Sequence, residues 1–94
     1  MENLKEKGLE IFKAIFEGKK SVEIDDIKYA IKKFSSGIKY VDIFGYRFIE
    51  QNRRKKSEWA KKAREGHKII WIIKGRRYLA QIMDGKYTDL TKKK

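Results

Sequence analysis

Basic and aromatic side chains are concentrated in residues 52–77, the stretch of this sequence best suited to bind a ligand. Four consecutive basic residues occupy 53–56, a tryptophan follows at position 59, and a second tryptophan at position 71 precedes another basic cluster. Cationic side chains neutralise phosphates, and aromatic rings stack on unpaired bases with a gain on the order of 1–3 kcal/mol per base. These residue types therefore favour recognition of a single-stranded polyanion.

The net charge of the chain indicates the same class of partner. The 94 residues include 25 Lys and Arg against 13 Asp and Glu, a formal net charge of +12. Residues 1–37 carry 8 Lys and 7 acids, a net of +1, whereas residues 38–94 carry 17 basic and 6 acidic residues, a net of +11. Such a field attracts nucleic acid or an anionic membrane surface, and a merely soluble basic surface is the alternative.

Catalysis has little support in the sequence. The chain has one histidine, His67, and no cysteine. It offers no tight cluster of carboxylates for a metal ion or an acid–base pair, and its two Gly-Lys-Lys and Gly-Arg-Arg segments lack the spacing of a phosphate-binding loop. We therefore expect a protein that is not an enzyme, without a metal ion or cofactor, in which His67 has a structural role.

The sequence also favours a cytoplasmic protein. It has no cysteine for disulfides and no pattern typical of a signal peptide. Its longest apolar run, residues 69–73, is far shorter than the roughly 20 residues that cross a bilayer. A charged fraction of 40% with few amide side chains is typical of thermophilic proteins, although AT-rich genomes favour a similar composition.

Helical periodicity dominates the first part of the chain. Residues 2–17 carry large apolar side chains at helical spacing, and Gly18 follows as a C-terminal cap. Residues 25–36 repeat the pattern with Asp25 as the N-cap. We assign a helix to residues 38–51 as well, although their aromatic content and Gly45 also allow an extended segment. After a charged connection, Ser57 can cap a short helix that ends at Gly66.

From His67 onward the pattern changes to strands. Residues 67–74 form an apolar, β-branched run, residues 77–83 alternate, and Asp84-Gly85 is a strong hairpin signal before a third strand at 86–90. We predict an α+β fold, with three or four helices followed by and packed on one face of a small antiparallel β-meander. Residues 1–91 would form a single domain with one sheet face free for a ligand, and residues 92–94 a basic tail.

The candidate contact residues combine the charged and aromatic groups of the basic half. Core positions are the competing interpretation for both tryptophans, whereas Phe34 and Phe48 are expected in the core by periodicity. The residues expected to contact phosphates are Arg53, Arg54, Lys55, Lys56, Lys61, Arg64, Lys74, Arg76 and Arg77, and those expected to contact bases are Trp71, Tyr78, Trp59 and Tyr46.

Two segments of the chain resemble a known family. "FIEQN" followed by "KKSEWAKKAREGHKIIWIIKGRRYLAQIMDGK" is similar to the ThermoDBP-like proteins, archaeal single-stranded nucleic-acid-binding proteins and their shorter relatives. The resemblance covers about residues 48–86 and implies helices on an antiparallel sheet, with an apolar cleft for bases and a basic rim for phosphates. The founding members carry a C-terminal coiled coil that has no counterpart in this sequence, so a homodimer remains open. The matching positions are Phe48, Gln51, Asn52, Ser57, Trp59, Ala60, Ala63, Arg64, Gly66, His67, Trp71, Tyr78, Asp84 and Gly85.

The leading hypothesis is thus non-enzymatic binding of single-stranded DNA or RNA through a basic-rimmed cleft with aromatic stacking, without a membrane or a small-molecule substrate as partner. One alternative is a winged-helix-like protein that binds duplex DNA through the helix around Trp59. Another is a small toxin-type ribonuclease that uses His67, Arg64, Arg77 or Tyr87. A third is an adaptor for an acidic protein surface or the ribosome. The sequence does not distinguish DNA from RNA.

Overall fold

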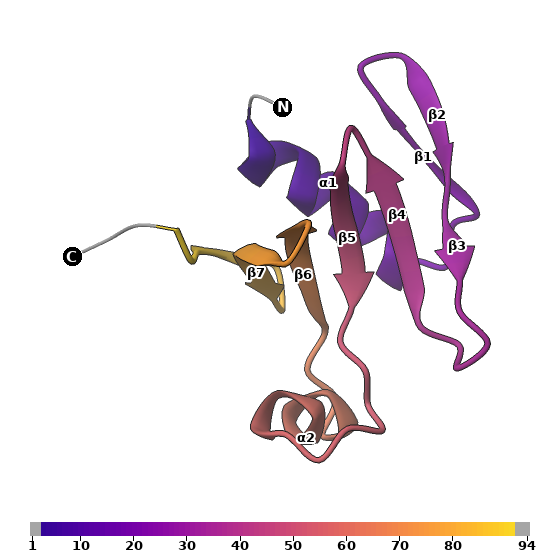
Figure 1. Ribbon diagram of the computed structural model, residues 1–94. Helices are drawn as coiled ribbons and strands as arrows, with labels where there is room; N and C mark the ends of the chain where they lie inside the picture. Colours follow the sequence, from indigo (N-terminus) through magenta and orange to yellow (C-terminus); the bar gives the residue numbers. More distant parts are fainter. Residues whose placement is uncertain (1–2, 92–94) are drawn as a thin grey trace.

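The computed structural model describes residues 3–91, and within them it has two helices and eight strands (Figure 1). The prediction of three or four helices is therefore wrong, and the fold is a mostly-β form of the α+β class. The expected basic tail at 92–94 lies outside the described residues. The helices are α1 (Leu4–Phe16) and α2 (Glu58–Arg64), and the strands are β1 (Ser21–Ile24), β2 (Ile27–Ala30), β3 (Lys32–Lys33), β4 (Lys39–Ile43), β5 (Tyr46–Glu50), β6 (Ile69–Lys74), β7 (Arg77–Met83) and β8 (Lys86–Asp89).

Helix α1 forms where the sequence predicts it. Its apolar side chains recur at helical spacing, and Ile11, Ala14 and Ile15 are buried against the sheet. Gly8 lets the helix approach closely, because a Cβ atom there would lie 2.9 Å from the Ile72 Cδ1 atom. No helix in residues 3–91 is long and apolar enough to cross a membrane.

The helix predicted at residues 25–36 is instead the turn of the β1–β2 hairpin, strand β2 and the short strand β3. Asp25 and Asp26 form the hairpin turn with φ angles of 50° and 65°. Aspartate tolerates this left-handed region, and a two-residue turn with both φ values positive matches the twist of paired strands. Strand β2 pairs with β1, whose Val22 and Ile24 are buried in the core, so pairing with the preceding strand outweighs an apolar spacing that also fits a helix.

The helix predicted at residues 38–51 is the β4–β5 hairpin. Its turn lies at Phe44 and Gly45, with φ angles of 48° and 82°. Val41, Ile43 and Phe48 are buried on one face, and the alternate residues Asp42 and Arg47, paired across the hairpin, lie on the other. The extended alternative that aromatic content and Gly45 allowed is therefore the correct one.

Strands β3 to β8 pair in sequence order into one six-stranded antiparallel sheet. The predicted meander of β6, β7 and β8 is confirmed, but it is only half of this sheet. Helix α1 lies across one face (Figure 1), where it packs with buried side chains of β4 to β7 in a single core cluster. Strands β1 and β2 form a separate two-stranded sheet that contributes Val22 and Ile24 to the same core.

Helix α2 lies beyond the ends of β5 and β6, away from the centre of the sheet (Figure 1). The predicted cap is confirmed, because the Ser57 Oγ atom accepts a hydrogen bond of 3.1 Å from the Ala60 backbone N–H. Ala60 and Ala63 are its buried residues. The face of the sheet opposite α1, which we call the open face, is thus left without a covering helix over β4 and β5.

Candidate nucleic-acid interface

Strand register places the side chains of the open face in two rows across the sheet. One row runs through Tyr40, Ile49, Trp71 and Gln81, each directly opposite the next on the adjacent strand. The parallel row runs through Asp42, Arg47, Ile73 and Tyr78. Because side chains alternate along a strand, the positions on β4, β5 and β6 point away from α1. On β7 a register shift opposite Ile72 and Ile73 brings Tyr78 and Gln81, three residues apart, into the same two rows. The open face therefore combines aromatic, aliphatic and charged groups.

Two tryptophans and a tyrosine form what we call the tryptophan cluster. The ring centroids of Trp59 and Trp71 are 5.7 Å apart, and those of Trp71 and Tyr78 are 5.4 Å apart, with nearly perpendicular planes in both pairs. Such edge-to-face contacts are favourable and fix the orientation of the rings. Tyr78 is 54% exposed, whereas both tryptophans are half-buried. Trp71 thus contacts the other two rings, and all three also reach solvent.

A buried glutamine holds Trp71 in place. The Trp71 indole Nε1–H donates a hydrogen bond of 2.6 Å to the Oε1 atom of Gln51, and the Gln51 Nε2 atom donates one of 3.0 Å to the Asn52 carbonyl. Gln51 is only 8% exposed. Apart from the family resemblance, no sequence pattern singled out Gln51. The bond to Asn52 orients the glutamine, and the bond to Trp71 fixes one edge of the indole. The faces of the ring remain for contacts with other groups.

The basic loop, residues 53–56, follows directly and is exposed along its whole length. Arg64 organises it from α2, since its Nη1 atom donates hydrogen bonds to the carbonyls of Arg53 at 2.6 Å and Lys55 at 3.0 Å. The Asn52 Oδ1 atom accepts a further bond of 2.8 Å from the Arg54 backbone N–H. The Nη1 atom of Arg64 thus shapes this loop, and the prediction that this exposed side chain also contacts phosphate stays a prediction.

Helix α2 adds cations next to the tryptophan cluster. Lys61 is exposed, as expected of a phosphate contact. The Lys62 Nζ atom lies 4.7 Å from the centroid of the Trp59 ring, a cation–π distance. Lys62 was not among the predicted contacts, because a short lysine-rich helix does not reveal which lysine covers the ring.

Four predicted contacts lie elsewhere. Tyr46 and Lys74 are cross-strand partners at the other end of β5 and β6, with the Lys74 Nζ atom 5.1 Å from the Tyr46 ring centroid. Their register, like that of Arg77 opposite Lys74, is that of the α1 face, and Tyr46 packs against the core cluster. Arg76 lies in the β6–β7 turn. These four residues are not brought together with the tryptophan cluster.

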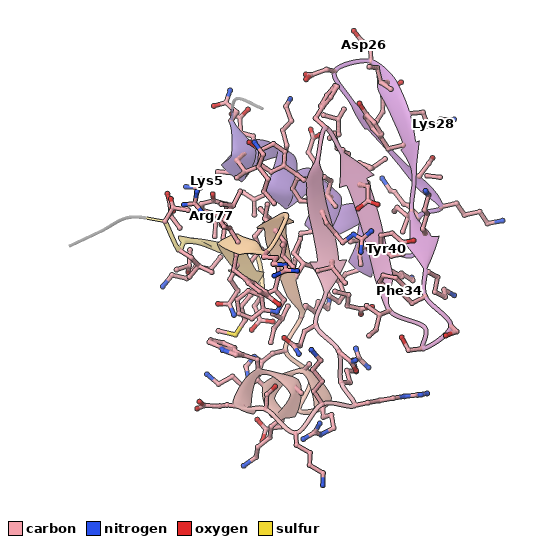
Figure 2. The ribbon with its side chains drawn as sticks, viewed as in Figure 1. Lys5, Asp26, Lys28, Phe34, Tyr40 and Arg77 are labelled. Atoms are coloured by element: carbon pink, nitrogen blue, oxygen red, sulfur yellow. The ribbon has the colours of Figure 1, made fainter. Side chains whose placement is uncertain are left out.

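Sequence reasoning missed a second aromatic group, which we call the Phe34 cluster: Phe34, Tyr40 and Arg47. The rings of Phe34 and Tyr40 are stacked, with centroids 4.2 Å apart and planes inclined by 19° (Figure 2). The Arg47 guanidinium carbon lies 4.7 Å from the Tyr40 centroid and 5.7 Å from that of Phe34. The prediction that Phe34 is a core residue is wrong, because it is 37% exposed in the β3–β4 loop.

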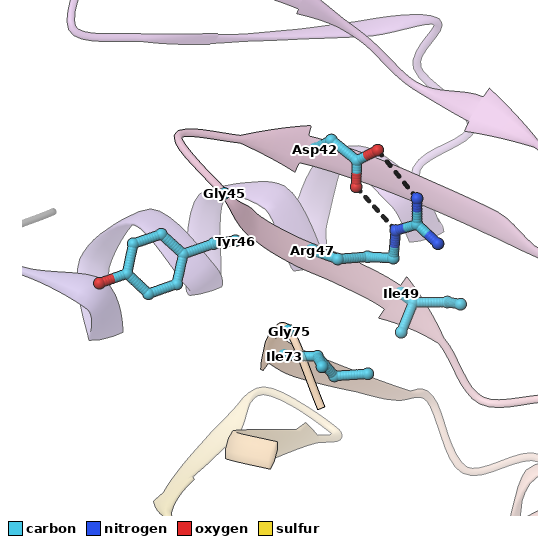
Figure 3. A pocket seen from close by; sticks show the side chains of 7 residues that line it. All are labelled: Asp42, Gly45, Tyr46, Arg47, Ile49, Ile73 and Gly75. Carbon is cyan, nitrogen blue, oxygen red and sulfur yellow. Dashed lines mark hydrogen bonds and ion pairs between the residues drawn. The ribbon is translucent and has the colours of Figure 1, made fainter. Parts of the chain in front are cut away.

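Asp42 fixes the Arg47 side chain. The Arg47 Nε and Nη2 atoms donate hydrogen bonds of 2.8 Å and 3.0 Å to the two carboxylate oxygens (Figure 3). The hydrogen bond from Arg47 lowers the pKa of Asp42, against an opposing effect of partial burial, and the same bond raises the pKa of Arg47. This two-pronged geometry is specific to arginine.

Two hollows mark the open face. One of about 500 Å³ lies over Arg47, Ile49 and Ile73, and Figure 3 shows Tyr46 pointing away from these side chains. The other, of about 250 Å³, lies between the two clusters and is lined by Phe34, Ile49, Trp71, Ile73, Tyr78 and Lys55, among others. The aromatic groups and the basic loop therefore border one continuous surface.

His67 lies outside this surface. Its Nδ1 atom is 2.7 Å from the Asp84 Oδ2 atom, and the Lys68 backbone N–H donates a hydrogen bond of 2.9 Å to Asp84 Oδ1. These bonds tie the start of β6 to the β7–β8 turn, which is a structural use of the histidine. Within residues 3–91, no group of three or more His, Asp or Glu side chains could hold a metal ion.

Comparisons with protein-family models, with characterised proteins and with solved structures gave no significant match for this chain. The resemblance to the ThermoDBP-like proteins therefore rests on the quoted residues alone. The interpretation of the open face must come from its geometry and charge.

Proposed function

We propose that this protein binds single-stranded DNA or RNA across the open face of its sheet, without catalysing a reaction. The observation that carries the proposal is the tryptophan cluster, two partly exposed rings on the open face and one on α2, beside an exposed loop of four cations. Aromatic platforms beside basic grooves suit unpaired nucleotides, because each base offers a flat face and each phosphate a charge.

The stacking groups have distinct roles. Tyr78 offers the most exposed ring of the cluster at 54% and would receive a base directly. Trp71 supports it from the edge and borders the smaller hollow, so a base stacked on Tyr78 would also contact the indole. Stacking of this kind tolerates any base, which favours binding with little sequence preference.

The basic loop and α2 would hold the phosphates. Arg53, Arg54, Lys55 and Lys56 extend into solvent from a backbone that Arg64 and Asn52 fix by hydrogen bonds. A loop held in one conformation loses less entropy on binding than a free one. Contacts with phosphates release counterions, so affinity should fall steeply and linearly on a logarithmic salt axis.

A winged-helix mode of duplex recognition lacks support in this fold. Residues 25–36 and 38–51, which would have supplied its helices, form strands, and α2 has only seven residues. We therefore propose that the protein binds single strands in preference to duplex. The proposal also includes a cytoplasmic location and a relationship to the ThermoDBP-like proteins.

Fluorescence-anisotropy titration tests the proposal with labelled single-stranded DNA, single-stranded RNA and duplex of equal length, each at two salt concentrations. Tryptophan emission is recorded in parallel, since both tryptophans of the chain belong to the cluster. We expect preference for single strands, with altered tryptophan emission. Duplex preference, RNA cleavage, or no binding to any of the three would contradict the proposal.

A further inference from the structure

The Phe34 cluster shares the open face with the tryptophan cluster but lies on other strands. Tyr40 on β4 and Trp71 on β6 occupy the same cross-strand row, separated by Ile49 on β5. Two strand spacings put them about 10 Å apart. The smaller hollow, of about 250 Å³, bridges this distance, because Phe34 lines it on one side and Trp71 and Tyr78 on the other. A ligand on one cluster therefore has a direct path to the other.

The chemistry of the Phe34 cluster repeats that of the first. Phe34 offers a partly exposed ring that already stacks on Tyr40, so a base could extend the stack. The backbone of the loop is fixed, since the Phe34 N–H donates to the Ile38 carbonyl at 2.9 Å and the Gly37 N–H to the Phe34 carbonyl at 2.8 Å. The ring is thus presented by an ordered loop.

Hydrogen-bond donors accompany these rings, although the charge of Arg47 is paired with that of Asp42. Arginine has five N–H donors in a planar fork, and Arg47 uses its Nε and one Nη2 donor on Asp42. The guanidinium is held beside Tyr40 at 4.7 Å, with an edge in position to meet a phosphate. Lys55 lines the hollow, together with the acidic Glu50. A strand that crosses the hollow would therefore meet Lys55, and beside Tyr40 it would reach the remaining N–H donors of Arg47.

We propose that the Phe34 cluster is a second base-stacking station, so that a single strand bound at the tryptophan cluster continues across β5 to Phe34. This inference rests on the proposed function. It adds the path of the bound nucleic acid, which runs across the strands of the sheet, and it requires a minimum length of oligonucleotide to reach both stations. Short oligonucleotides reach only the tryptophan cluster, whereas longer ones occupy both stations.

The test is a length series of oligothymidines, from about 3 to about 12 nucleotides, titrated into the wild-type protein and the Phe34→Ala variant. We expect the variant to bind the shortest oligomers as the wild type does. For the longest oligomers its affinity should be lower by about 5-fold to about 140-fold, the loss of one stacked base. Circular dichroism and thermal unfolding confirm that the variant is folded.

Phe44→Ala is the matched control. Phe44 is a 66% exposed phenylalanine at the β4–β5 turn, whose edge contact is with Tyr29 at a centroid distance of 6.3 Å. The Phe44→Ala variant removes the same side chain as Phe34→Ala, on the same sheet but away from both clusters. We expect this variant to bind oligomers of every length as the wild type does.

The outcomes separate the two proposals. If the wild type binds no oligomer of any length, the proposed function fails. If the wild type binds but Phe34→Ala matches it at all lengths, or loses affinity equally for short and long oligomers, the second station is wrong while single-strand binding stands. An equal loss in Phe44→Ala would also overturn the second station.

Discussion

The two faces of the six-stranded sheet come from the same strands and differ in almost every property. On the α1 face, Val41, Phe48 and Ile72 alternate with the open-face residues and are fully buried. On the open face the neighbouring positions hold Tyr40, Arg47 and other aromatic or charged groups. Alternation along each strand therefore assigns stability to the side chains of the α1 face and binding to those of the open face. A substitution on one face can then leave the other unchanged.

The largest effect is expected on the α1 face. Phe48→Ala removes a side chain that is 0% exposed, and the loss of apolar burial plus the cavity left behind should lower the free energy of unfolding by about 3–5 kcal/mol. Urea denaturation followed by circular dichroism measures it. Tyr78→Ala on the open face serves as the control, with a much smaller loss. Similar losses for both variants would contradict the division between faces.

The reverse pattern is expected for affinity. Trp71→Ala removes the central ring of the tryptophan cluster and should weaken single-strand binding by about 1–3 kcal/mol. Trp71→Phe keeps an aromatic ring but loses the hydrogen bond to Gln51, so its loss should be smaller. Anisotropy titration of both variants gives the comparison, and wild-type affinity in Trp71→Ala would exclude the indole from the site.

Sequence patterns predicted the parts of this fold whose signals are local. Helix α1 has an uninterrupted amphipathic pattern, α2 has its Ser57 cap, and the β7–β8 turn has Asp84-Gly85. Residues 25–36 were misassigned because Ile27, Ala30, Ile31 and Phe34 are spaced as on a helix face. Pairing with distant strands decided their structure, and one short sequence window does not contain that information.

The candidate site was predictable by residue type and only partly by position. Trp59, Trp71 and Tyr78 were selected for their charge context, and the structure brings them together. The Phe34 cluster depends on the register between β4 and β5, which follows only once both segments are known to be strands. Tyr46 was misplaced for the same reason, since one step along β5 changes its face.

The basic loop allows a finer separation of contact from positioning. Arg54→Ala should reduce the slope of log affinity against log salt by about 0.7, the value for one phosphate contact on a single strand. Arg64→Lys keeps the charge but loses the fork that binds the Arg53 and Lys55 carbonyls. We expect it to leave the slope unchanged and to speed amide hydrogen exchange in residues 53–56. A reduced slope in Arg64→Lys would instead make Arg64 a phosphate contact.

The smallest effect is expected at Asp84, in the β7–β8 turn. Hydrogen bonds from the Lys68 backbone N–H and from His67 lower the pKa of this carboxyl in the folded protein. A depressed folded-state pKa stabilises the fold above the ordinary pKa of aspartate, and this stability is lost as the pH falls through the lower folded-state value. Thermal unfolding from neutral to strongly acidic pH should show a modest decline.

Asp84→Asn is the matched variant for this decline, because asparagine tolerates the φ angle of 53° at this turn. In this variant the melting temperature should decline less at acidic pH. The decline that remains would include the contribution of Asp42, whose pKa is also lowered. An acid branch identical to that of the wild type would show that Asp84 contributes nothing to the pH dependence.

The most direct measurement is a two-dimensional ¹H–¹⁵N NMR titration with a single-stranded oligonucleotide, read at the two indole N–H signals and at the amides of α1. The chain has only these two tryptophans, and both belong to the tryptophan cluster, so each indole reports on it. We predict that both indole signals shift together with the amides of residues 53–56 while the α1 amides stay in place. Binding that shifts the α1 amides and leaves both indoles unchanged would contradict the assignment of the open face.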